Sequence, residues 1–99
     1  MISEELLQEA KSYLDITWEL DAGERTKLSG ILERGMAALS GRLGPCDFET
    51  NGEEKDLLLN YAMYARAGAV DEFWKNYRDS IISLQIHKWA MKAGEGSCG

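Results

Sequence analysis

The residue types that most often carry out catalysis are scarce in this chain and far apart. His87 is its only histidine, and neither Cys46 nor Cys98 has an obvious base beside it in the sequence. Nucleophilic catalysis requires a nucleophile within hydrogen-bond reach of a base, and no such pair is evident here. We therefore predict that the protein is not an enzyme and has no catalytic residue.

The spacing of the cysteine, histidine, glycine and acidic residues does not indicate a metal or cofactor site either. The two cysteines form no CxxC pair and no histidine cluster accompanies them, unlike the pattern of zinc sites and disulfide scaffolds. No glycine-rich run has the spacing that cradles a phosphate. Adjacent acidic residues occur at Glu4/Glu5, Glu53/Glu54 and Asp71/Glu72. Because neighbours do not share a helix face, we interpret them as solvated charge and expect no metal, cofactor or small-molecule substrate.

The remaining chemical signal is aromatic and lies in the last 40 residues. It consists of Tyr61, Tyr64, Phe73, Trp74, Tyr77 and Trp89. Tyr61, Phe73 and Tyr77 fit a helical core. Trp74 and Trp89 fall off the main apolar stripe, and large aromatic residues away from a core are enriched at protein interfaces. The pattern favours an interaction module over an enzyme.

One long helix, from Glu53 to about Leu84, is predicted to position these aromatic residues. Its apolar side chains recur every three or four residues, the spacing of one helix face: Leu58, Ala62, Ala65, Ala69, Phe73, Tyr77, Ile81 and Leu84. Such a helix would be about 48 Å long, so we expect part of it to contact another molecule. At Gly68 we expect close helix packing, with a kink as the alternative.

Two shorter helices are predicted before it. Ser3 is a typical N-cap for a helix that continues to about Leu14. Asp21 and Glu24 have the spacing of a capping box, which predicts a second helix from residue 21 to about Leu43.

Glycine and proline mark the end and one face of the second helix. Gly44 and Pro45 end it. Within it, Gly30 and Gly35 each cost roughly 1 kcal/mol relative to alanine, so we expect another helix to approach closely at both.

The connecting segments are short and polar. Residues 15–20 are predicted to be extended, with Trp18 packed in the core as a staple against the second helix; a ligand-stacking role is the alternative. In the loop 46–52, Thr50 or Asn51 is expected to form a capping box with Glu53 or Glu54. Residues 93–99 have nothing to bury, so a disordered tail is predicted.

Composition predicts a single all-α domain, a small bundle in which two or three shorter helices pack on the long one.

The net charge is −6, and residues 1–24 hold seven acidic residues but only one basic residue, Lys11. An acidic chain without a basic run is poorly suited to gripping nucleic acid or an anionic membrane. With no signal peptide or membrane-spanning stretch in the sequence, we expect a protein made in a reducing cytoplasm.

The order of these segments resembles the head-tail connector (adaptor) proteins of tailed bacteriophages and prophages, often labelled possible DNA-packaging proteins. The resemblance covers roughly residues 2–86: an acidic first helix ending YLDITW, then LSGILERGMAALSGRLG, a DFE loop, and LLLNYAMYARAGAVDEFWKNYRDSIISLQI. Its most specific positions are Leu57, Leu58, Tyr61, Tyr64, Arg66, Ala69, Asp71, Glu72, Phe73, Asn76, Tyr77 and Leu84. Residues 87–99 depart from the family pattern.

The resemblance implies a structural subunit of the virion's head-tail junction, made in the host bacterium. Similar proteins form a ring beneath the portal, extend the DNA channel and support the tail or stopper protein, while DNA passes without tight binding. A non-virion cytoplasmic adaptor that dimerises through the long helix is the alternative.

Ring formation needs unlike faces that meet. We predict that the long helix packs on the acidic helices of a neighbour, with these interface residues: Arg66, Val70, Trp74, Lys75 and Arg78 on one face, and Glu4, Glu5, Glu9 and Asp21 on the other.

Overall fold

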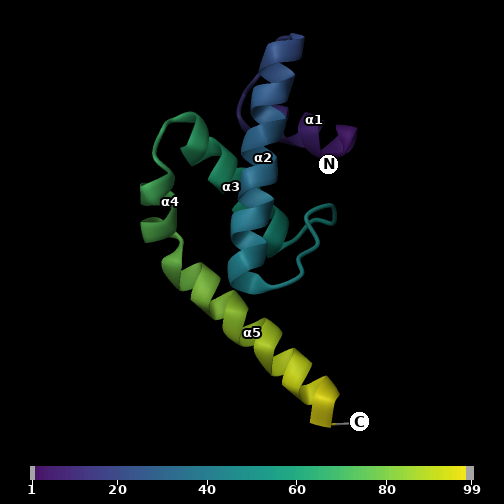
Figure 1. Cartoon of the computed structure of the whole chain (residues 1–99), viewed down its shortest axis with the longest axis vertical. Coiled ribbons are helices and arrows are strands. Elements are labelled where there is room, and N and C mark those ends of the chain that lie inside the picture. Colours follow the sequence, from purple (N-terminus) through teal and green to yellow (C-terminus); the bar gives the residue numbers. More distant parts are fainter. Residues whose placement is uncertain (1, 98–99) are drawn as a thin grey trace.

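The computed structural model describes the backbone of residues 2–97 and the side chains of residues 2–90. Over this part of the chain there are five helices and no strand (Figure 1): α1 (Glu4–Tyr13), α2 (Ala22–Leu43), α3 (Glu53–Arg66), α4 (Val70–Asn76) and α5 (Arg78–Ser97). The molecule is elongated, with extents of 50 × 27 × 18 Å. The predicted all-α class, with one long helix packed by shorter ones, is confirmed.

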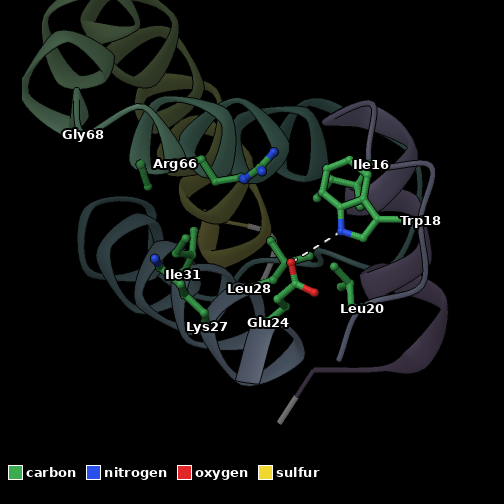
Figure 2. A pocket seen from close by; sticks show the side chains of 10 residues that line it. Ile16, Trp18, Leu20, Glu24, Lys27, Leu28, Ile31, Arg66 and Gly68 are labelled. Carbon is green, nitrogen blue, oxygen red and sulfur yellow. Dashed lines mark hydrogen bonds between the residues drawn. The ribbon is translucent and has the colours of Figure 1, made fainter. Parts of the chain in front are cut away.

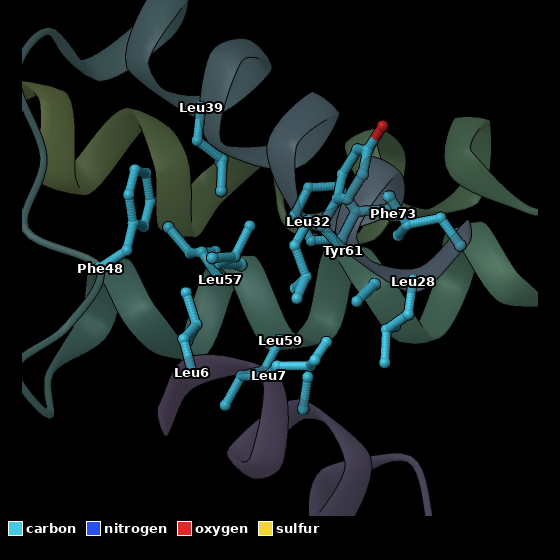
Figure 3. Close-up of a cluster of buried hydrophobic side chains, with 14 of the residues drawn as sticks. Leu6, Leu7, Leu28, Leu32, Leu39, Phe48, Leu57, Leu59, Tyr61 and Phe73 are labelled. Atoms are coloured by element: carbon cyan, nitrogen blue, oxygen red, sulfur yellow. The ribbon is translucent and has the colours of Figure 1, made fainter. Parts of the chain in front are cut away.

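Helix α2 is the long helix around which the others are arranged (Figure 1). It packs against α3 and the start of α5, while α1 covers another side of α3. The core between them is made of leucine and other apolar side chains, among which Leu6, Leu32, Leu39, Leu58 and Phe73 are fully buried (Figure 3).

The predicted starts of the first two helices are confirmed. Ser3 Oγ accepts a hydrogen bond from the Leu6 backbone N–H at 3.1 Å. Asp21 and Glu24 form the predicted capping box, each side chain accepting from the other's backbone N–H. The second helix ends at Leu43, and Gly44 follows with a φ of 80°. These signals are local, since each involves residues within one helical turn.

The predicted long helix over residues 53–84 is wrong, because the chain bends twice within it. Helix α3 ends at Arg66, and Gly68 takes a φ of 71°, which favours glycine. A second break at Tyr77 separates α4 from α5. The bends let α4 fold back on α3, so that the Phe73 and Tyr61 rings lie 5.4 Å apart. Burying Phe73 in this way compensates for the interrupted helix.

Of the three glycines expected at helix contacts, only Gly35 lies at one. A Cβ atom on Gly35 would lie 2.7 Å from Tyr61 and 2.8 Å from Leu58. A Cβ on Gly30 would meet only the end of the Arg34 side chain, and one on Gly68 would meet nothing within 4 Å. Gly68 therefore marks the break in the helix, the alternative to packing, and Gly35 is where α3 approaches α2.

Alanine at these two glycines of α2 is expected to have opposite effects. Gly30→Ala should stabilise the protein by about 0.5 to 1 kcal/mol, because alanine is the better helix former. Gly35→Ala gains the same propensity but overpacks the α2–α3 contact, which typically costs about 1 to 3 kcal/mol. Urea unfolding of the two variants measures the difference, and equal effects would contradict the close approach at Gly35.

The connecting segments differ from expectation. Trp18 is 50% exposed, so the prediction that it packs in the core is wrong. Helix α3 starts after Gly52 without a side-chain cap. Instead, Asp47 accepts hydrogen bonds from the backbone N–H groups of Glu49 and Thr50 and closes the loop on itself.

At the C-terminal end, helix α5 continues to Ser97, where a disordered tail from residue 93 was expected. Residues 98 and 99 of that tail lie outside the described residues. A helix that is already nucleated gains one hydrogen bond for each residue added, which offsets the low propensity of the glycines.

Candidate interaction surfaces

The aromatic residues that suggested an interface largely pack on one another. Phe73 is fully buried, stacks on Tyr77 at 4.9 Å and meets Trp74 edge-on at 4.9 Å. Trp74 is also covered by the Arg42 guanidinium, 3.8 Å from its ring centre. Trp74 is therefore half-buried within its own chain, whereas Trp89 is 72% exposed.

Two acidic residues of the predicted interface have partners within the chain. Glu4 pairs with Arg25 at 2.5 Å, and the hydrogen bond from Arg25 lowers the pKa of Glu4. Glu9 pairs with Lys55.

The other predicted interface residues differ in exposure. Glu5, Asp21, Arg66, Lys75 and Arg78 are exposed, while Val70 is half-buried against the core. The interface stays a prediction, but Trp74, Glu4 and Glu9 are less free to form it than the sequence suggested.

A groove with an apolar floor opens between the α1–α2 linker, α2 and the end of α3 (Figure 2). Its volume is about 420 Å³. The lining residues are Ile16, Trp18, Leu20, Glu24, Lys27, Leu28, Ile31, Ala65, Arg66 and Gly68, and we name it the Trp18 groove. Its size lies within the usual range for binding pockets.

The walls of the Trp18 groove carry both signs of charge. The Trp18 indole N–H donates to a Glu24 carboxylate oxygen at 3.4 Å, which orients the ring along the groove (Figure 2). Lys27 and Arg66 are exposed on the walls, and neither belongs to an ion pair formed among the described residues. The groove thus combines an apolar floor with two cations that have no carboxylate partner in that part of the chain.

Helix α5 presents a second apolar surface. Ile82, Ile86 and Trp89 are 39%, 60% and 72% exposed and share one helix face. Asp79 precedes Ile82 by three residues and is exposed on the same face. We name these four residues the α5 stripe. The opposite face is buried through Ile81 and Leu84, so α5 is apolar on two sides and its own chain covers only one.

The α5 stripe was not predicted from the sequence because part of it lies beyond the predicted end of the helix. The predicted helix ended at about Leu84, so Ile86 and Trp89 lay beyond it, and Trp89 also fell in the divergent segment 87–99. Their spacing from Ile82, three and four residues, was a readable signal.

Lys88 holds the middle of α5 to the body of the molecule. Its ammonium donates to the Pro45 carbonyl at 2.6 Å and to Glu54 at 2.7 Å. Partial burial raises the pKa of Glu54, but the Cys46 thiol and the Lys88 ammonium more than offset this, so the pKa lies below its ordinary value.

Protonating Glu54 should weaken this attachment of α5. Because the pKa of Glu54 is lowered by folding, the stability it contributes is present above its unfolded pKa, about 4.5, and is lost as pH falls through the lower folded pKa. Glu54→Gln should therefore cost about 1 kcal/mol at pH 7 and progressively less below pH ~4.5. Urea unfolding from pH 7 to 3 tests this, and a cost that is constant over this range would contradict the pair's role.

The described residues offer little to reactive chemistry. They include no group of three or more potential metal-ligating side chains. Burial, together with the nearby Glu54 carboxylate, raises the pKa of the Cys46 thiol to about 11, so the nucleophilic thiolate is rare at neutral pH.

None of the described helices has the length and apolar character needed to cross a membrane. Comparisons of the chain with protein-family models, with curated proteins and with solved structures gave no match.

Proposed function

We propose that this protein is a structural subunit of a phage head-tail connector, which assembles as a ring below the portal. The observation that carries the proposal is the pair of unlike, uncovered apolar surfaces on one small helical body, the Trp18 groove and the α5 stripe. A contact between two unlike surfaces is head to tail, and a repeated head-to-tail contact closes into a ring when the rotation between neighbours allows it.

The resemblance of residues 2–86 to connector proteins supplies the biological setting. In that setting the ring extends the DNA channel and gives the tail or stopper protein a platform at the head-tail junction. The work of such a subunit is assembly, which agrees with the absence of a catalytic pattern in the sequence.

Charge supports a channel through which DNA passes without being held. The chain carries a net charge of −6, with the excess at the amino end. Acidic walls repel phosphate and let a duplex slide.

The purified protein is therefore expected to have negligible affinity for duplex DNA at physiological salt, because its net charge of −6 repels phosphate and its sequence has no basic run. Fluorescence anisotropy with a labelled duplex measures this, at both low and physiological salt. Tight binding that weakens steeply with salt would argue against a passive channel wall.

The rival function is a cytoplasmic adaptor that forms a two-fold dimer. The α5 stripe favours this function because an exposed apolar helix face can pack against the same face of a second copy. Such a dimer would leave the Trp18 groove open, whereas the connector uses both surfaces.

Binding to the portal distinguishes the two functions. A tagged copy of the chain should retain the portal protein encoded nearest to its gene, in a complex that contains many subunits per portal assembly. A two-fold dimer that retains no portal would support the rival instead.

A further inference from the structure

We infer that the α5 stripe of one copy docks in the Trp18 groove of the next copy, with Asp79 facing Lys27 and Arg66. This inference deepens the proposed function and rests on its self-association. It replaces the Trp74-centred contact with one built from surfaces that the fold leaves uncovered.

The groove is suited to an apolar helix. Its floor is formed by Leu28 and Ile31, and half of the Trp18 side chain remains exposed at its edge. On α2 the lining positions from Glu24 to Ile31 cover two helical turns, about 10 Å of wall. An amphipathic helix laid along such a wall inserts anchors spaced three or four residues apart.

The α5 stripe has that spacing. Asp79, Ile82, Ile86 and Trp89 stand at intervals of three, four and three residues and cover about 15 Å of helix. Trp89 is the most exposed of the large apolar side chains among the described residues, and a tryptophan is the typical anchor of an interface.

Charge fixes the direction in which the stripe would lie. Asp79 is the only acidic residue between Arg78 and Ala90, and it takes part in no ion pair of the described chain. Lys27 and Arg66 on the groove walls are the complementary charges. The Glu24 carboxylate on the same wall already accepts a hydrogen bond from Trp18, so Asp79 is expected to lie beside the two cations, which favours one register of the stripe.

The occupant is a second copy, because the α5 stripe complements the groove in charge but extends away from the groove of its own chain. The groove lies at the amino-terminal half of α2, and α5 extends toward the opposite end of the molecule (Figure 1). Each copy therefore offers one helix and one groove, so the contact repeats head to tail.

Cysteine cross-linking tests the contact directly. In a background with Cys46→Ser and Cys98→Ser, one sample carries Ile86→Cys and a second carries Ala65→Cys, a groove position of nearly unchanged size. Mild oxidation of the mixture should give a disulfide-linked dimer of the two variants. A chain with both substitutions should give a ladder of oligomers.

Two matched substitutions serve as controls. Glu33→Cys, on the exposed side of α2 away from the groove, replaces Ala65→Cys of α3. His87→Cys, at an exposed position about 100° round α5 from Ile86, replaces Ile86→Cys. Trp89→Ala in the cross-linking pair should lower the yield about tenfold, as expected for an anchor residue. Circular dichroism confirms that each variant is folded.

The outcomes separate this inference from the proposed function. A yield no greater than that of the controls, or a dominant symmetric dimer of Ile86→Cys alone, would overturn the docking. If Trp89→Ala leaves complete rings on the portal, the docking is wrong while the connector function stands. If the wild-type protein does not bind the portal but the specific cross-link forms, the docking stands and the connector function is wrong.

Discussion

Replacing Phe73 with alanine is expected to lower the free energy of unfolding by about 3 to 5 kcal/mol. The side chain is fully buried where α4 folds back on α3. Its ring touches four other aromatic rings, those of Tyr61, Tyr64, Trp74 and Tyr77. Truncation leaves a cavity that these large rings cannot easily fill, so most of the lost packing energy is not recovered.

Urea unfolding followed by circular dichroism measures this loss. Trp89→Ala is the matched control, because it also removes a large aromatic side chain but one that is 72% exposed. The control should change stability by no more than about 0.5 kcal/mol. A loss below about 1 kcal/mol for Phe73→Ala would mean that α4 does not pack on α3 as described.

Removing the charge of Glu9 should cost about 2 to 3 kcal/mol, a large effect for a half-exposed residue. Glu9 pairs with Lys55, whose side chain is only 4% exposed. The Lys55 ammonium also donates to the Asn51 side chain at 3.0 Å and to the Glu49 carbonyl at 3.4 Å. Without Glu9, a buried cation keeps only neutral partners, which compensate poorly for its lost hydration.

A double-mutant cycle of Glu9→Gln, Lys55→Met and the two together tests the pair. Glu9→Gln alone should be clearly destabilising, whereas Glu5→Gln, an exposed neighbour on α1, should have little effect. Adding Lys55→Met to Glu9→Gln removes the buried charge and should restore part of the stability. Equal stabilities of Glu9→Gln and Glu5→Gln would show that Lys55 does not depend on the pair.

The parts of the fold predicted from sequence were those set by local chemistry. Ser3 and the Asp21–Glu24 pair determine helix starts within one turn, so their effect is readable from neighbouring letters. The prediction of one long helix over residues 53–84 was wrong because the spacing of its apolar residues continues unchanged through Gly68. Apolar spacing alone does not reveal a bend in the backbone. Whether a glycine packs or bends depends on what lies opposite, which is tertiary information.

The candidate surfaces show the same limit. Lys55 was an ordinary charged residue in the sequence, and only the approach of α1 and the loop before α3 gives it three partners. Trp18 was assigned to the core and instead borders an open groove. Trp89, by contrast, was singled out from its type and spacing alone, because a large aromatic residue beyond the main stripe is a readable signal.

Electron microscopy of the portal mixed with an excess of this protein would show whether the chain assembles as a ring. The proposed function predicts an added ring below the portal, with one copy of this chain beside another around the channel. The Trp74-centred contact would be lost in Trp74→Ala, whereas the docking inferred here would be lost in Trp89→Ala. A bare portal with the wild-type protein, with the chain left as a monomer or a two-fold dimer, would contradict the assignment as a connector.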